Sequence, residues 1–314
     1  MLQWPSPARG AEITMPRRRA SGNPLIDSMI TRRYFLRFLA GLPFLTGLPF
    51  GLPKVWAQAP VNGKVSPGMH IGRTFSGEEL HYDIAFWLLS KVAVVKMTFA
   101  PGAGEGMYVS TLQGETVGLT GFVTRNRTDT YRAVMEEIDG GRRLRSVSFE
   151  EQVRIGKKTR KRTHTFDHVN RKWVERNVRM SGAASEEAHI IPPDKDYNDF
   201  LTASYNFRYG VYGAVERGST YRVPVFPKKD VEAYDVKVIS KAEEESLRER
   251  ISAPHGGEYR IELAMDPEVV HSERGLIKGW LAKELYPVEG MMEDVFLFGD
   301  VRGTLKKRIK PDLS

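Results

Sequence analysis

The sequence contains no cysteine among its 314 residues. This absence excludes disulfide bonds, a lipidated cysteine anchor, thiol nucleophiles and thiolate metal sites. Stability must therefore come from a packed core alone. Residues 60–314 are numerous enough to bury such a core, in one large domain or two small ones.

The sequence also lacks an uninterrupted apolar run of membrane-spanning length. Its most apolar stretch, residues 38–53, is interrupted by glycines and prolines. It is also shorter than the roughly 20 residues that a spanning helix needs. We therefore expect no integral membrane span in the mature chain, which should be soluble or peripheral.

That short apolar stretch fits an export signal. It follows the basic segment Thr31–Arg37, which reads TRRYFLR and resembles a twin-arginine signal through Arg32 and Arg33. It precedes Ala57 and Ala59, which form an A-x-A cleavage site. The pattern predicts recognition by the twin-arginine (Tat) translocase and a periplasmic location. The alternative is an ordinary Sec signal that happens to contain paired arginines.

The segments around this signal suggest a division of the chain. Residues 1–28 lie upstream of the signal, and we expect translation to start at Met29, or else at Met15. Residues 29–59 form the signal peptide, and residues 60–76, which are rich in Gly, Pro and Ser, form a loose entry segment. Residues 77–308 then form the folded β domain.

The formal net charge of +8 is concentrated in the leader. Residues 1–59 contain eight of the 47 basic residues and two of the 39 acidic ones, which leaves 39 and 37 in the remainder. The mature chain is therefore almost neutral. Its charge gives no reason to expect a nucleic-acid partner.

Period-two alternation dominates the sequence after residue 77. Leu80, Tyr82, Ile84 and Phe86 alternate with polar or small residues, and similar short runs recur up to residue 308. We expect one such strand over 117–126 and a break in the pattern over 183–196. The best helix candidate is 199–209. These features predict an all-β, mainly antiparallel fold, as a curved sheet, half-barrel, barrel or sandwich with one short helix.

Several landmarks together resemble a bacterial family known as domain-of-unknown-function family 3108. They are GEELHYDI at 77–84, DFLTASYNFR at 199–208, GWL at 279–281 and FGDVRGTL at 298–305. The resemblance implies an exported, antiparallel β protein, distantly similar to lipoprotein carriers whose curved sheet wraps an apolar cavity. Lys283 and Glu284 depart from the family pattern after the tryptophan. The family supplies no catalytic residues to carry over.

Motifs for catalysis and cofactor binding are missing from the sequence. There is no nucleophile elbow, no phosphate-binding glycine loop and no dinucleotide fingerprint. His164 and His168 have the spacing of metal ligands on a helix, but in the strand predicted there they lie about 13 Å apart. We therefore expect no metal and no cofactor, and a binding protein rather than an enzyme.

Two groups of residues are candidates for binding. The first consists of aromatic residues that can line an apolar concavity, Trp87, Tyr205 and Trp280, together with Arg208. Arg208 can hold a carboxylate or a headgroup, or can pair with a buried acid. The aromatic residues can equally be ordinary core.

The second group is a basic cluster that can contact anionic lipid or polymer. It can equally be a solvated hairpin tip that protects the edge of the sheet. Its members are Lys157, Lys158, Arg160, Lys161 and Arg162.

These expectations combine into one hypothesis with two alternatives. The favoured function is a non-catalytic periplasmic module that binds a lipid-like or hydrophobic ligand, with a lipid or an anionic envelope component as the expected partner. One alternative is a structural or adaptor protein of the cell envelope that has no ligand. The other is a hydrolase of envelope polymers that uses carboxylates dispersed in the sequence.

Overall fold

The computed structural model of the chain describes residues 70–86, 89–228, 231–247, 253–265, 275–295 and 299–311. The predicted signal residues Arg32, Arg33, Ala57 and Ala59 lie outside these ranges. The described helices are α2 (Ile71–Phe75), α3 (Gly118–Val123), α4 (Phe200–Tyr209) and α5 (Lys241–Ser246). The strands of the first half are β1 (Glu79–Phe86), β2 (Leu89–Pro101), β3 (Met107–Thr116), β4 (Thr128–Ile138), β5 (Arg143–Ile155), β6 (Lys158–Asp167), β7 (Lys172–Val178) and β8 (Ala184–Ile190). Those of the second half are β9 (Thr220–Lys228), β10 (Val231–Val238), β11 (Tyr259–Ala264), β12 (Leu276–Leu281), β13 (Pro287–Val295) and β14 (Gly299–Ile309).

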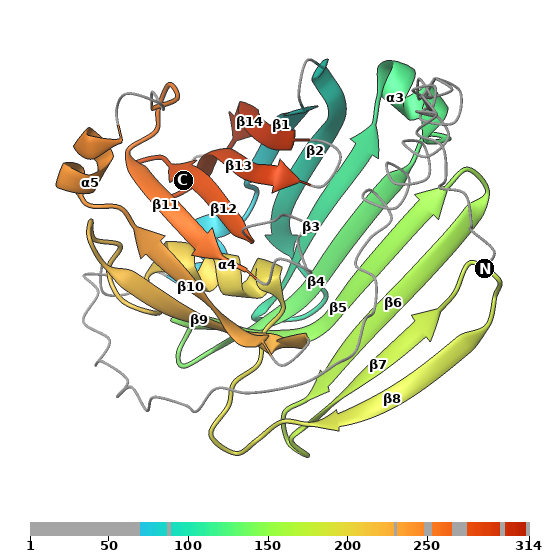
Figure 1. Cartoon of the computed structure of the whole chain (residues 1–314). Coiled ribbons are helices and arrows are strands. Elements are labelled where there is room, and N and C mark those ends of the chain that lie inside the picture. Colours follow the sequence, from blue (N-terminus) through green and yellow to red (C-terminus); the bar gives the residue numbers. More distant parts are fainter. Residues whose placement is uncertain are drawn as a thin grey trace, which may run out of the picture.

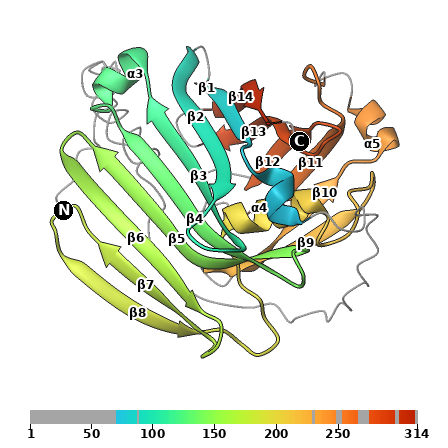
Figure 2. The same ribbon diagram turned by 180° about the vertical axis from the view of Figure 1, so that it is seen from behind.

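All fourteen strands form one antiparallel sheet. Its order is β8-β7-β6-β5-β4-β3-β2-β1-β14-β13-β12-β11-β10-β9. Two meanders, β1–β8 and β9–β14, are joined where β1 pairs with β14. The sheet curves strongly around α4 without closing, so that β8 and β9 stand at its two ends (Figures 1 and 2). The expected all-β, antiparallel, curved sheet with a short helix is confirmed.

Helix α4 lies inside the curve of the sheet, where it packs against β4, β5 and β9. Asp199 caps its first turn by accepting hydrogen bonds from the backbone N–H groups of Leu201 and Thr202. Gly210 ends the helix in the left-handed conformation, with a φ of 86°. The helix begins and ends where the sequence predicted.

The two faces of α4 support two separate clusters. Leu201 and Tyr205 pack in a cluster with residues of β1–β7, whereas Ala203 and Phe207 pack with residues of β9–β12. At 3.6 residues per turn, a step of two residues turns about 200° around the helix, so these pairs point in opposite directions. The helix therefore fills the space between the two halves of the sheet.

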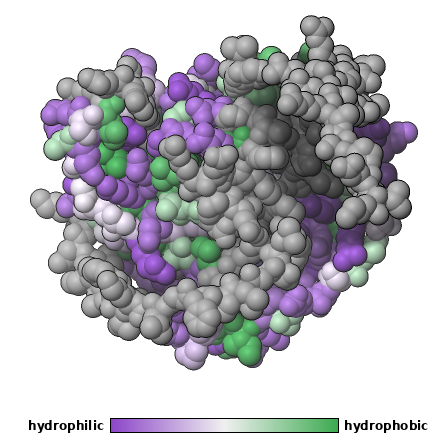
Figure 3. Space-filling model, viewed as in Figure 1, coloured by the Kyte–Doolittle hydropathy of each residue, from purple (hydrophilic) through white to green (hydrophobic). Residues whose placement is uncertain are grey.

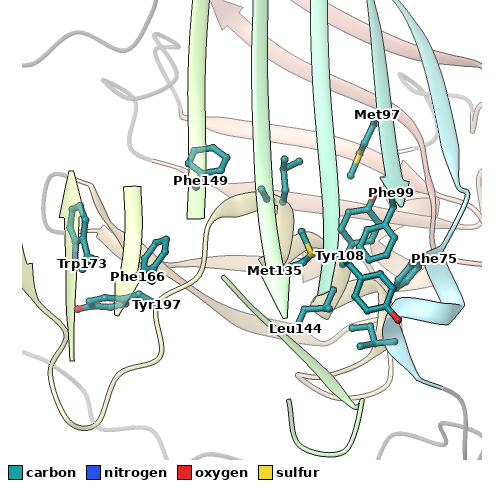
Figure 4. Close-up of a cluster of buried hydrophobic side chains, with 14 of the residues drawn as sticks. Phe75, Met97, Phe99, Tyr108, Met135, Leu144, Phe149, Phe166, Trp173 and Tyr197 are labelled. Carbon is teal, nitrogen blue, oxygen red and sulfur yellow. The ribbon is translucent and has the colours of Figure 1, made fainter. Parts of the chain in front are cut away.

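The larger cluster extends along the inner face of the first meander. Figure 4 shows Phe75, Phe99 and Tyr108 together at one side and Phe166, Trp173 and Tyr197 at the other. The Phe99 ring stacks on Tyr108 at 5.4 Å between centroids. Aromatic side chains thus supply much of the packing that a chain without disulfides requires.

Two local expectations from the pattern are wrong. Residues 117–126, expected as a strand, contain helix α3, which connects β3 to β4. Residues 183–196, expected as a break, contain β8. Both segments lie at the margins of the sheet, where burial no longer imposes alternation on the sequence.

Candidate functional site

The register of β4–β7 arranges the side chains of the inner face in rows that run across the strands. One row contains Phe166 and Trp173 and continues to His189 on β8. The next row contains Phe149 and His164, and continues to Glu175. Polarity therefore rises along this face of the sheet.

Two further rows continue the trend toward the end of the sheet that carries α3. One consists of Tyr131, Glu151 and Arg162. The last row contains Asp129, Val153 and Arg160, which lie opposite one another on β4, β5 and β6. Aromatic side chains thus gather toward α4, and charged side chains gather toward α3.

Aromatic rings from three separate parts of the chain meet on this face. Phe226 of β9 lies 4.6 Å from the His164 ring, 5.7 Å from Trp173 and 6.0 Å from Phe149, measured between centroids. Trp173 stacks on His189 at 3.9 Å. With Tyr131, Phe166 and Phe200, these residues form what we call the inner aromatic cluster.

Phe200 is the most exposed member of this cluster, in which Tyr131, His189 and Phe226 are half-buried. Its ring lies edge-to-face against Tyr131 at 5.6 Å and against Phe149 at 5.4 Å. Even so, 38% of its surface is exposed. The first residue of α4 thus presents an aromatic surface over the inner face of the sheet.

A set of charged residues borders the cluster on its α3 side. It draws on the last three of the rows described above and on Arg127, which precedes β4, and we call the whole set the inner polar row. It consists of Arg127, Asp129, Glu151, Arg160, Arg162 and Glu175. Arg127 donates two hydrogen bonds to Asp129, at 2.7 and 2.8 Å. The Arg162 Nε lies 3.2 Å from a Glu175 oxygen. With three basic and three acidic members, the row has no net charge.

Burial perturbs the ionisation of these groups. Desolvation raises the pKa of the Asp129 carboxyl, against the opposing effect of Arg127. It also raises the pKa of the Tyr131 hydroxyl, and the nearby carboxylates of Glu151 and Asp129 act in the same direction. The polar row therefore lies in a partly desolvated environment, where hydrogen bonds and charge contacts are stronger than in bulk water.

Side-chain hydrogen bonds fix α4 against β5. Pairing between β5 and β6 begins at Ser148, so the preceding residues of β5 lack β6 as a partner. The Asn206 amide replaces it, because Oδ1 accepts from the Leu144 N–H at 2.9 Å and Nδ2 donates to the Leu144 carbonyl at 2.8 Å. Asn198 accepts similarly from the Ser146 N–H.

The N-terminal end of α4 carries a further buried contact. The Ser146 hydroxyl donates to Asp199 at 2.7 Å, and the Thr202 hydroxyl donates to the same carboxylate at 2.6 Å. His168 contacts the Ser146 carbonyl at 2.7 Å rather than the hydroxyl. Ser, His and Asp therefore meet here without the nucleophile–base contact that a catalytic triad requires.

Arg208 forms a buried ion pair with Glu78. Its Nη1 and Nη2 atoms lie 2.8 and 2.9 Å from the two carboxylate oxygens, and its Nε donates to the Leu285 carbonyl. The side chains are 2% and 1% exposed. Burial opposes the charged form, but Glu78 outweighs it and raises the pKa of Arg208. Of the two roles that the sequence left open, the geometry matches pairing with a buried acid.

The other aromatic candidates do not meet in one place. Tyr205 is fully buried against Phe75 and Phe99, at 5.0 and 4.6 Å. Trp280 pairs across β12 with Arg260 and Glu289, on the face opposite to its neighbour Leu281. Since Leu281 packs toward α4, Trp280 belongs to the outer face. Trp87 lies outside the described residues.

The basic cluster is divided between two faces. Lys157 and Lys158 are exposed at the β5–β6 turn. Arg160 and Arg162 alternate with Lys161, which pairs with Glu150 at 2.7 Å. The two arginines lie on the inner face, in the inner polar row. The structure therefore places only part of this cluster at the tip of the hairpin.

Sequence reasoning missed the residues that the inner face brings together. Tyr131, Phe149 and Phe226 each occupy an alternating strand, which identifies them as inward-facing but not as neighbours. Phe200 opens the helix predicted at 199–209, and its place in the sequence gives no sign of its exposure. Only the register of the sheet reveals their contact.

The described residues give no support for a metal centre or a membrane-spanning helix. Within them, no group of three or more His, Cys, Asp or Glu side chains is placed to hold a metal ion. None of the helices described is long and apolar enough to cross a membrane.

Fold and site together define an open, curved antiparallel sheet around a central helix, with an amphipathic inner face. The family model described as "Protein of unknown function (DUF3108)" matches residues 81–306, and the chain belongs to that family. It is also similar to a solved structure, the beta-barrel-like protein of the DUF1849 domain from Brucella abortus. That likeness has a TM-score of 0.41 and 11% identity, over 76% of this chain and 99% of the other. No curated protein matches the sequence.

Proposed function

We propose that this protein is exported by the Tat translocase and binds an amphiphilic, lipid-like ligand in the periplasm, without catalysing a reaction. The ligand lies on the inner face of β4–β7. Its apolar part contacts Phe200 and the half-buried Tyr131 beside it, at the accessible border of the inner aromatic cluster. Its polar part points toward the inner polar row.

The observation that carries this proposal is the exposure of Phe200. An aromatic ring that is 38% exposed, and that also contacts Tyr131 and Phe149, extends a buried aromatic surface into solvent. Contacts of this kind are typical of the lining of hydrophobic ligand sites.

The charges beside this surface narrow the class of ligand. Because the inner polar row has three basic and three acidic members, it does not select a strongly anionic head. Its alternating donors and acceptors suit a zwitterionic or hydroxyl-bearing head group, which can pair with both signs. The proposed ligand is therefore an amphiphile with a neutral or zwitterionic head.

Native mass spectrometry of the protein purified from its own periplasm is the first test. We expect a bound mass that denaturation releases as a lipid. A mass corresponding to the protein alone, with no uptake of lipid or of the fluorescent amphiphile N-phenyl-1-naphthylamine in vitro, would contradict the proposal. It would favour a structural or adaptor role. Turnover of an envelope polymer would instead favour the hydrolase.

The Phe200→Ala variant tests the location of the site. A phenylalanine side chain has a total surface of roughly 200 Å². At 38% exposure, roughly 75 Å² of the Phe200 surface is accessible to a ligand. At about 25 cal/mol per Å², its loss should weaken amphiphile binding by about 2 kcal/mol, or roughly 20-fold. Phe122→Ala, which removes an 81% exposed ring on α3, is the matched control and should leave this affinity unchanged.

A further inference from the structure

Helix α3 presents two large apolar side chains to solvent at one end of the sheet. Leu119 is 79% exposed and Phe122 is 81% exposed. They are three residues apart and therefore lie on the same side of the helix. On the side of the molecule shown in Figure 3, the described surface is mainly hydrophilic with small, separate hydrophobic patches. A pair of exposed large side chains on one turn contrasts with that background.

The helix is held firmly in this position. Thr124 and Thr116 share a 2.6 Å hydrogen bond between their hydroxyls, and the Val117 N–H donates to the Val92 carbonyl of β2. Gly121 faces the Thr116 carbonyl so closely that a Cβ atom would lie 2.8 Å from that oxygen. A larger residue at position 121 would push the helix away. These contacts therefore hold α3 in the orientation that exposes Leu119 and Phe122.

Basic residues lie directly after α3 and at the adjoining β5–β6 turn. The β5–β6 turn lies beside α3, since the Gly156 N–H donates to the Arg125 carbonyl at 3.1 Å. Arg125, Arg154, Lys157 and Lys158 are all exposed. The acids closest along the chain are Asp129, which is paired with Arg127, and Glu115, which is exposed at the end of β3. Positive charge therefore predominates at this end.

We propose that this end of the sheet docks on the surface of a bilayer containing anionic phospholipid. Leu119 and Phe122 enter the interface, and Leu89, which is 48% exposed at the start of β2, adds to the apolar contact. The four basic side chains contact the head groups around them. Apolar insertion combined with a basic border is the combination that holds peripheral proteins on anionic membranes.

The opposite end of the sheet provides a contrast. Val169 and Ile190 are 92% and 82% exposed there, so they match the α3 pair in exposure. Near them in the chain, Asp167 pairs with the exposed Lys172 at 3.9 Å, and Glu186 and Glu187 are exposed, so positive charge does not predominate at this end. Apolar exposure alone does not distinguish the two ends, but charge does. The inference therefore depends on the combination at α3, and it is independent of the inner-face site.

Vesicle flotation with purified protein tests this inference. We expect binding to phosphatidylcholine vesicles that contain about one third phosphatidylglycerol, and weak binding to phosphatidylcholine alone. Leu119→Ser with Phe122→Ser should weaken binding at least 100-fold. Lys157→Gln with Lys158→Gln should weaken it about 30-fold.

Two matched controls should bind as the unmodified protein does. They are Val169→Ser with Ile190→Ser, and Lys306→Gln with Lys307→Gln, a pair of exposed lysines on β14. Urea denaturation curves confirm that all variants fold. Equal binding to both vesicle types, unchanged binding of the α3 variant, or equal loss in the controls would overturn the inference. Self-association that the α3 variant abolishes, without vesicle binding, would overturn it in favour of a second copy. The Phe200→Ala variant should still bind vesicles, so the two proposals can fail separately.

Discussion

Replacing Arg208 by methionine should destabilise the protein strongly. The Glu78 carboxylate is 1% exposed and depends on Arg208 for its two shortest contacts, at 2.8 and 2.9 Å. Without the guanidinium, Arg308, at 3.4 Å, is the basic partner that remains for it among the residues the structure describes. The chain would then have to bury a carboxylate with a single, longer ion pair.

The expected loss of stability follows from leaving the buried Glu78 carboxylate without its main charge partner. Removing one partner of a buried ion pair typically costs about 3–5 kcal/mol, because the remaining charge stays in a poorly solvated position. Arg308 is 22% exposed and sufficiently close to offset part of this cost. We therefore expect a loss of about 3 kcal/mol, at the lower end of the range. Replacing both partners, as Glu78→Leu with Arg208→Met, should cost less than the single change, because the buried carboxylate is then absent and Arg308, which is 22% exposed, remains in contact with water.

Urea denaturation followed by tryptophan fluorescence measures these differences. Arg222→Met is the matched control, since Arg222 pairs with Asp235 at 3.7 Å while both side chains are more than half exposed. Exposed pairs contribute about 0–1 kcal/mol. If Arg208→Met were as mild as Arg222→Met, or if the double change were worse than the single one, Arg208 would not be acting as the partner of a buried acid. Its assignment to ligand binding would then regain support.

Three further predictions concern α4 and the leader. Asn206→Leu should lower the free energy of unfolding, measured by urea denaturation, by about 2–6 kcal/mol, because it leaves the Leu144 N–H and carbonyl without their partner. A decrease below about 1 kcal/mol would contradict this account. Burial raises the pKa of Asp199 above its ordinary 3.8, although hydrogen bonds from Ser146 and Thr202 oppose the shift. The folded state then binds the extra proton, so the stability of the unmodified protein relative to Asp199→Asn should rise as pH falls through the folded pKa toward 3.8; a difference that is constant with pH would refute it. Replacing Arg32 and Arg33 by lysine should block export as followed by cell fractionation, and unimpaired export would assign the leader to the Sec route.

Much of the fold is readable from the sequence because burial imposes a period on it. Leu80 and Tyr82 alternate with polar residues since the inner face of β1 contacts the core, and this alternation predicts the strand. Helix α4 was predictable for a different reason. Asp199 is a cap residue, and the apolar residues that follow it recur at helical spacing.

The arrangement of the candidate site was not readable in the same way. Alternation shows that Phe149 and His164 face inward, but their contact depends on the β5–β6 register. Trp280, a candidate for lining the apolar concavity, is 4% exposed, yet it lies on the outer face. Identity and burial alone do not determine which side of a sheet a residue occupies, whereas the neighbouring Leu281 does.

The two edge strands of the open sheet show why the sequence pattern did not predict β8. A strand with an unpaired edge invites association with other chains, and proteins counter this with charges and prolines. β8 carries Glu186 and Glu187, while β9 contains Pro224 and Pro227. The same residues that protect such edges are those that sequence patterns interpret as interruptions of a strand. The apparent break at 183–196 is thus a consequence of an unclosed sheet whose edges resist further pairing.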